Sequence, residues 1–307
     1  MTLAACGLVR CTPAPLDLAE TEALYADPLH PPAGALPVYY LGHSLIGRDI
    51  PSMVAQLAGH DYAVQLGWGT ALKAHWEPAE PINGFEQENA HPHFREAREA
   101  LESGDYGAFV LTEMVEIEAA IDYFDAPFYL HQWARLARDN APGMRIYLYE
   151  TWHRLDDPQG WMARLKADTQ RYWENALLRP AMNYRDGVKP IYVIPGGQVL
   201  ARFIQEVEAR GGIGTIQTRE DLFSRTNDGS LDTIHLNDLG NYLIALTHYA
   251  VLYHRSPEGL AFDLKRSDGH SAVSPGAEAA QLMQRIVWEI VTSYPKTGVR
   301  QSLKSQS

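Results

Sequence analysis

Ser44, Asp232 and His235 are residues whose types and spacing could carry out hydrolytic chemistry. Ser44 stands in a Gly-His-Ser-Leu segment directly after a short apolar run. Asp232 and His235 are three residues apart in an Asp-Thr-Ile-His segment, which is predicted to be a tight loop just before a helix. A serine hydroxyl becomes an effective nucleophile when an imidazole takes its proton and a carboxylate orients that imidazole. These residues therefore predict a triad in which Ser44 is the nucleophile, His235 the base and Asp232 the orienting acid.

Each half of this triad also has a simpler interpretation when it is considered alone. A serine after glycine commonly caps a turn between a strand and a helix. An aspartate and a histidine near a helix start can pair locally without any catalytic role. The occurrence of both halves at opposite ends of one domain favours the catalytic interpretation.

The elements that must position these residues alternate between strands and helices. The predicted strands are residues 38–41, 62–66, 108–111, 145–149 and 190–194. The predicted helices are residues 50–57, with Asp49 as the N-cap, 94–101, 127–139, 161–178, 199–209, 238–253 and 278–292, and a long loop covers 73–93. Such alternation predicts a parallel sheet covered on both faces, with ligands bound at the carboxyl ends of its strands. We expect one domain over residues 36–295, an N-terminal arm over 1–35 and a C-terminal tail over 296–307.

The two triad segments, in this order, make residues 36–255 resemble the SGNH (GDSL-like) hydrolase family. The resemblance implies a three-layer α/β/α flavodoxin-like fold with a five-stranded parallel sheet, and ester hydrolysis through an acyl-enzyme. It also implies an oxyanion hole formed by the amides of Ser44 and Gly69, with Gly67 as an alternate, and by a side chain after the third strand. There the chain has Leu-Thr-Glu-Met where the family has Gly-x-Asn-Asp. An ionised Glu113 would repel an oxyanion, so Thr112 is the expected donor unless burial keeps Glu113 protonated.

Several polar and aromatic residues are candidates for binding a substrate at the same edge of the sheet. Tryptophan faces can stack on sugar rings, although tryptophan is also an ordinary packing residue. Glu113 could anchor a substrate hydroxyl, and His43 could be a substrate contact or a buried hydrogen-bond partner. The predicted substrate-binding residues are His43, Glu113, Trp68, His75 and Trp152.

The predicted function is removal of a small acyl group, such as acetyl, from a carbohydrate ester. Two alternatives remain open. The same triad would serve a carbohydrate O-acyltransferase, and the altered third segment is compatible with a non-catalytic carbohydrate-binding protein. A nucleotide-binding flavodoxin-like protein is disfavoured because the Pro-Gly-Gly-Gln segment at 195–198 lacks phosphate-loop spacing.

Composition and charge exclude other classes of protein. The net charge of −12 disfavours nucleic-acid binding, and no apolar stretch reaches the length of a membrane span. The histidines, such as His91, His93 and His153, show no metal-ligand spacing, so neither a metal nor another cofactor is expected.

The two cysteines, Cys6 and Cys11, lie near the N-terminus. The Leu-Ala-Ala-Cys-Gly segment around Cys6 is similar to the end of a bacterial lipoprotein signal, although only five residues precede that cysteine. We therefore expect an exported, periplasmic or lipid-anchored protein with Cys6 as the anchor. A disordered cytoplasmic N-terminus is the alternative.

Overall fold

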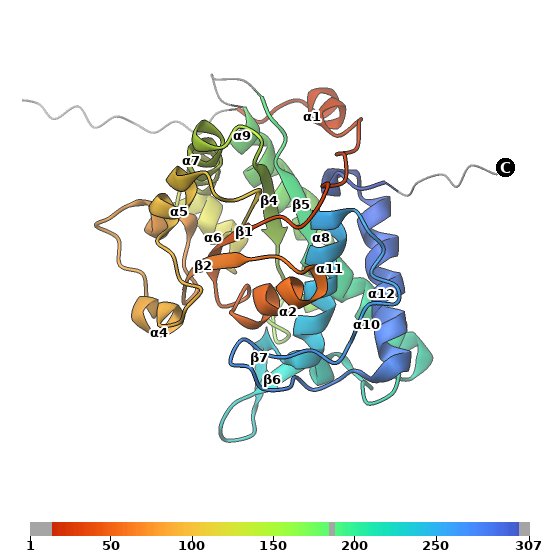
Figure 1. Cartoon of the computed structure of the whole chain (residues 1–307). Coiled ribbons are helices and arrows are strands. Elements are labelled where there is room, and N and C mark those ends of the chain that lie inside the picture. Colours follow the sequence, from red (N-terminus) through yellow and green to blue (C-terminus); the bar gives the residue numbers. More distant parts are fainter. Residues whose placement is uncertain (1–13, 184–187, 301–307) are drawn as a thin grey trace, which may run out of the picture.

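The computed structural model describes residues 14–183 and 188–300 (Figure 1). Within these ranges five parallel strands form one sheet in the order β2-β1-β3-β4-β5. The strands are β1 (Val38–His43), β2 (Tyr62–Gly67), β3 (Ala108–Leu111), β4 (Arg145–Glu150) and β5 (Tyr192–Pro195). This is the flavodoxin-like strand order, so the structure confirms the predicted fold class.

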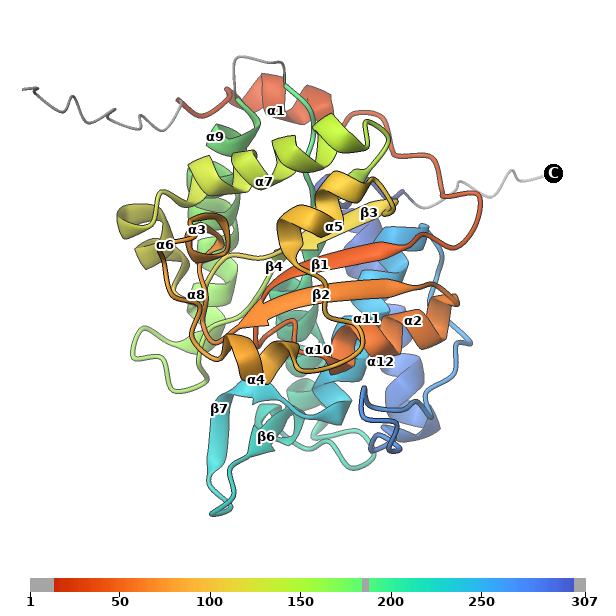
Figure 2. The ribbon, with the colours of Figure 1, turned by 60° about the vertical axis from the view of Figure 1, so that its left-hand side comes forward.

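The strands are continuous apolar runs because helices cover both faces of the sheet. Every residue of β1 and β3 is buried. On one face lie α2 (Asp49–Ala58), α10 (Gly196–Arg210), α11 (Asp238–Tyr253) and α12 (Gly276–Ser293). On the other lie α3 (Leu72–Trp76), α5 (Ala97–Ser103), α7 (Ala126–Asn140), the π-helix η1 (Thr169–Leu178) and α9 (Arg179–Met182) (Figure 2).

The predicted elements agree with the observed ones where the apolar pattern is strong. Strand 108–111 and helix 238–253 have the predicted bounds. Asp49, predicted as the N-cap of α2, is instead its first helical residue, and Arg48 is the N-cap. The predicted helix over 161–178 is divided into α8 (Trp161–Asp168) and η1.

Some short helices lack a readable period in the sequence. The predicted loop over 73–93 contains α3 and α4 (Phe85–Asn89), and α6 (Ile117–Tyr123) follows β3. The predicted arm contains α1 (Leu18–Leu24), and the buried Tyr25 donates to the carbonyl of Ile191 at 2.7 Å. Helices this short depend on tertiary contacts, because an isolated short helix is marginal in water.

The segment that carries Asp232 and His235 differs from its prediction as a loop. It forms β7 (Leu231–Leu236), which pairs antiparallel with β6 (Phe223–Arg225). This hairpin lies at the bottom of Figures 1 and 2, and α1 lies at the top. Pairing with β6 therefore gives the Asp-x-x-His segment an extended backbone that local sequence did not reveal.

Candidate active site

Ser44 follows β1 directly at the carboxyl edge of the sheet. The preceding Gly42 permits a close approach, because a Cβ at this position would lie 2.7 Å from Thr112 Cγ2 and 2.9 Å from Ile46 Cδ1. The chain then turns into α2, so the serine hydroxyl is held between the end of the strand and the start of a helix. Backbone amides near a helix N-terminus favour a developing negative charge.

Ser44, His235 and Asp232 form a continuous chain of hydrogen bonds. The His235 Nε2 atom lies 2.9 Å from the Ser44 Oγ atom. The His235 Nδ1 atom lies 2.8 Å from the Asp232 Oδ2 atom. Asp232 Oδ1 accepts the amides of Ile234 and His235, both at 3.0 Å. Burial alone would raise the pKa of Asp232, but these hydrogen bonds outweigh it and the pKa is lowered.

The loop after β4 holds the hairpin that carries two of these residues. The Trp152 indole donates to the carbonyl of Ile234 at 2.8 Å, and the amide of Leu155 donates to the carbonyl of Thr233 at 2.8 Å. Asn237 then caps α11, because its side chain accepts the amides of Leu239 and Gly240. The hairpin is thus fixed to β4 on one side and to a buried helix on the other.

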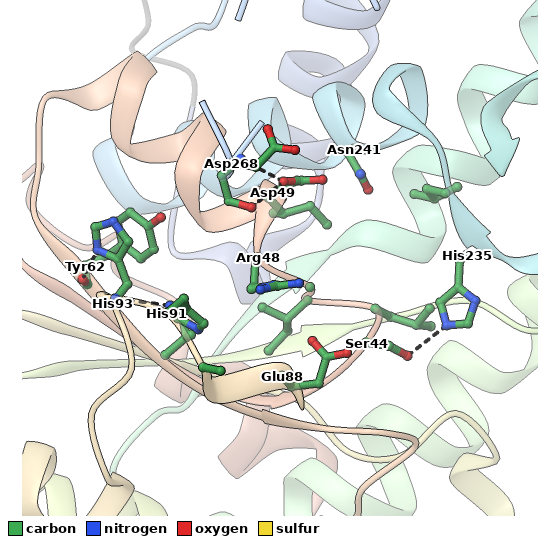
Figure 3. A pocket seen from close by; sticks show the side chains of 18 of the residues that line it. Ser44, Arg48, Asp49, Tyr62, Glu88, His91, His93, His235, Asn241 and Asp268 are labelled. Carbon is green, nitrogen blue, oxygen red and sulfur yellow. Dashed lines mark hydrogen bonds between the residues drawn. The ribbon is translucent and has the colours of Figure 1, made fainter. Parts of the chain in front are cut away.

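A cavity of about 590 Å³ begins at Ser44 and His235. Figure 3 shows these two residues at one end and Tyr62, His91 and His93 at the other. Between the two ends, apolar side chains such as Ile46 and Ile50 alternate with polar or charged ones, which are Arg48, Asp49, Glu88, Asn241, Ser267 and Asp268. This cavity therefore offers many hydrogen-bonding groups to a molecule whose reacting atom lies at Ser44.

A second cavity of about 630 Å³ also contains Ser44 and His235. Its lining includes apolar groups from Trp68, Val115 and Ile234. Gly69, expected to supply an oxyanion amide, lies in this lining with a left-handed φ of 55°. Trp68 is 51% exposed, and its indole donates to Glu88 at 2.8 Å. The structure thus brings Ser44, Gly69 and Trp68 together around one opening.

His43, His75 and Glu113 do not line either cavity, which corrects the expectation that they contact substrate. All three are buried. His43 Nε2 donates to the Glu113 carbonyl at 2.8 Å, and His75 Nε2 donates to the Gly42 carbonyl at 2.8 Å. Their hydrogen bonds are made within the protein interior. The three side chains therefore form a buried polar layer next to Ser44.

Burial sets the protonation of this layer. It lowers the pKa of His43 to about 4 and that of His75 to about 4, so both imidazoles are neutral at pH 7. Neutral rings fit the observed contacts, because His43 Nδ1 accepts the amide of Leu45 and His75 Nδ1 accepts the side-chain amide of Gln65. Burial likewise raises the pKa of Glu113 to about 7.

Thr112, predicted to donate to the oxyanion, faces the interior. It has no exposed surface, and its hydroxyl donates to the carbonyl of Tyr149 at 2.7 Å. The hydroxyl is therefore engaged between β3 and β4. Trp152 does line the first cavity, but it is only 1% exposed, so its main contact is with the hairpin.

Several cavity residues carry no motif that could mark them in the sequence. Arg48 lies four positions after Ser44, and its place in a turn after a strand was an available signal. Asn241 lies on α11, and Ser267 and Asp268 come from the connection between α11 and α12. The Ser267 hydroxyl, which donates to the Asp49 carboxylate at 2.7 Å, helps to hold the last two at the cavity.

Other predictions concern metals, membranes and the N-terminus. Among residues 14–183 and 188–300, no group of three or more His, Cys, Asp or Glu residues could hold a metal ion. Within the same ranges, no helix is long and apolar enough to cross a membrane. Cys6 and Cys11, and with them the predicted lipid anchor, lie outside the described residues.

Comparisons with known proteins found distant similarity among solved structures. No protein-family model matches the chain, and no curated protein matches it. A carbohydrate esterase family 2 enzyme with a carbohydrate-binding domain, from Corynascus thermopiles (Myceliophthora fergusii), has a TM-score of 0.34 and 11% identity, over 73% of this chain and 67% of that one. The acetyl xylan esterase Est2A from Butyrivibrio proteoclasticus has a TM-score of 0.28 and 9% identity, over 48% of this chain and 55% of that one. With TM-scores this low, these similarities do not bear on the activity of the chain.

Proposed function

We propose that the protein is a serine esterase that uses Ser44, His235 and Asp232 to cleave a carboxylic ester. The observation that supports this most strongly is the chain of hydrogen bonds from Ser44 Oγ to His235 Nε2 at 2.9 Å and from His235 Nδ1 to Asp232 Oδ2 at 2.8 Å. Both distances are within the range required for proton transfer and for fixing the imidazole tautomer. The hydroxyl also opens onto two cavities, so an ester can reach it.

In the proposed reaction Ser44 Oγ attacks the ester carbonyl while its proton moves to His235 Nε2. The carbonyl oxygen becomes an oxyanion, which the amides of Ser44 and Gly69 would stabilise. The carbon–oxygen bond to the alcohol then breaks, and His235 returns its proton to the leaving alcohol. Water attacks the acyl-enzyme with His235 as the base again, and this releases the acid and restores the Ser44 hydroxyl.

The first cavity, which runs from Ser44 to Tyr62 and is called the polar cavity below, supports a carbohydrate as the alcohol part of the ester. Its carboxylates, its guanidinium and the Asn241 amide can exchange hydrogen bonds with several hydroxyl groups. The exposed Trp68 ring at the second cavity could stack on a sugar ring. We therefore propose an acylated sugar as the substrate, with a small acyl group such as acetyl.

The test is hydrolysis of p-nitrophenyl acetate, butyrate and octanoate by the wild type and by Ser44→Ala. We expect wild-type activity that falls by at least about 10³-fold in the variant, because the nucleophile is lost. Ser293→Ala, which alters an exposed serine at the end of α12 outside both cavities that contain Ser44, is the matched control. Activity that survives Ser44→Ala would exclude the triad. An acetylated oligosaccharide, tried with and without a sugar acceptor, then separates hydrolysis from acyl transfer.

A further inference from the structure

The buried carboxyl group of Glu113 lies between the two segments that the proposed reaction must hold in register. One is the end of β1, which leads into Ser44. The other is the segment after β2, which contains Gly69 and continues into α3. Glu113 follows β3, the neighbour of β1 on the side away from β2. It is fully buried, so it can act on the reaction only through other residues.

The Glu113 side chain fastens the segment that contains Gly69. The amide of Leu72, at the start of α3, donates to Glu113 Oε1 at 3.1 Å and to Oε2 at 3.4 Å. The amide of Met114 donates to the same Oε1 at 3.0 Å. One carboxyl oxygen therefore joins the turn after β3 to a residue three positions beyond Gly69.

The backbone of Glu113 fastens the segment that contains Ser44. Its carbonyl accepts from His43 Nε2 at 2.8 Å, and the other nitrogen of that ring accepts the amide of Leu45 at 3.3 Å. The residues on both sides of Ser44 are thus tied to Glu113 through one imidazole. His75 adds a tie between α3 and the carbonyl of Gly42.

We propose that Glu113 is a positioning residue that keeps the Gly69 amide and the Ser44 hydroxyl at the separation needed for oxyanion stabilisation. The proposal rests on the esterase function proposed above. Its physical basis is that Leu72 has little freedom while its amide is bound to Oε1 and its carbonyl accepts the Trp133 indole at 3.1 Å. A misplacement of about 1 Å at a reacting group can cost about 10²-fold in rate.

The charge of Glu113 does not alter these two contacts. Either protonation state leaves Oε1 able to accept the amides of Leu72 and Met114. His43 on β1, whose ring donates to the Glu113 carbonyl, and His75 on α3 are both held neutral by burial, which lowers the pKa of each. An uncharged glutamine at this position would therefore preserve the positioning, whereas an apolar side chain would not.

The experiment compares Glu113→Met, which keeps the volume but has no oxygen, with Glu113→Gln, which keeps the acceptor. For p-nitrophenyl acetate, we expect kcat of Glu113→Met to fall about 10²-fold with KM changed by less than about threefold, because the oxyanion exists only in the transition state. We expect Glu113→Gln to retain kcat within about threefold. The matched control is Glu150→Gln, which alters another buried carboxyl, bound to Gln198 on α10.

Hydrogen exchange of a peptide covering residues 68–76 gives a second readout that does not depend on activity. Exchange should accelerate in Glu113→Met and remain slow in Glu113→Gln and Glu150→Gln. A folded Glu113→Met with wild-type kcat or wild-type exchange would overturn the proposal. Glu113→Asp, which withdraws the carboxyl by one methylene, provides the same comparison should Glu113→Met not fold. If the wild type cleaves no ester and does not react with an organophosphonate, the esterase function is refuted. Slow exchange of residues 68–76 in Glu113→Met would refute the positioning role of Glu113 independently of that result.

Discussion

Asp232→Asn tests the triad more sharply than removal of the serine, because it replaces one carboxylate oxygen by an NH2 group, removes the charge and changes almost no volume. Asp232 Oδ1 accepts two backbone amides at 3.0 Å, so the carbonyl oxygen of asparagine is drawn to the same place. The asparagine NH2 group then takes the place of Asp232 Oδ2, which lies 2.8 Å from His235 Nδ1 in the wild type. His235 must accept at Nδ1 and carry its proton on Nε2, where it can no longer take the proton of Ser44.

The size of the effect follows from the cost of the opposite asparagine orientation. Turning the amide over would lose two hydrogen bonds of about 1 kcal/mol each and direct N–H groups at backbone N–H groups. At about 2 kcal/mol, only about one molecule in 30 keeps the active tautomer. We therefore expect kcat/KM to fall by at least about 30-fold. The upper limit is about 10⁴-fold, or about 5.5 kcal/mol, which corresponds to complete loss of the correct tautomer.

The assay is kcat/KM for p-nitrophenyl acetate, measured with the melting temperature of each variant. Asp228→Asn is the control, because Asp228 lies in the turn of the same hairpin and its carboxylate accepts only local groups, Thr226 and Ser230. We expect this control to retain full activity. An Asp232→Asn enzyme that retains more than about a third of wild-type kcat/KM would refute the tautomer argument.

Two further predictions concern stability. Arg164 is buried and contacts Asp157 at 2.7 Å and Asp168 at 3.0 Å, so Arg164→Met leaves two buried carboxylates without their cation. We expect the free energy of unfolding, measured by urea denaturation, to fall by about 3–5 kcal/mol. The control Arg210→Met, on the surface of α10, should lose less than about 0.5 kcal/mol. A loss below about 1 kcal/mol in Arg164→Met would contradict the buried ion pairs. The second prediction concerns Glu150, whose pKa burial raises to about 8. A carboxyl pKa raised in the folded state stabilises the protein below the unfolded pKa of about 4.3, and that contribution is lost as the pH rises toward 8. Glu150→Gln should therefore gain stability relative to the wild type between pH 5 and pH 8, and equal melting curves at both values would show that the group ionises normally.

The sequence by itself determined the sheet and indicated the residues of a candidate triad. Continuous apolar runs such as 108–111 marked buried parallel strands, because only a strand covered on both faces is apolar at every position. The apolar face of α11 marked that helix to the residue. Ser44 and the Asp-x-x-His segment were recognisable as a candidate triad because the two segments occur together, at opposite ends of one alternation of strands and helices.

The tertiary structure decided which side chains near the strand ends are accessible. His43, His75, Thr112 and Glu113 lie close in sequence to the predicted rim, yet packing turns all four into the interior. Strand periodicity ends where the strand ends, so it cannot tell which way the next side chain points. It also cannot reveal that a distant strand, β6, extends the segment that holds Asp232 and His235.

The lining of the polar cavity was decided by contacts between segments far apart in the chain. Asp268 reaches it from the connection after α11 because the neighbouring Ser267 is bound to Asp49. Such a contact spans 218 positions. Local propensity carries no information about it, because the free energy that joins the two segments comes from burial and hydrogen bonds that exist only in the folded chain.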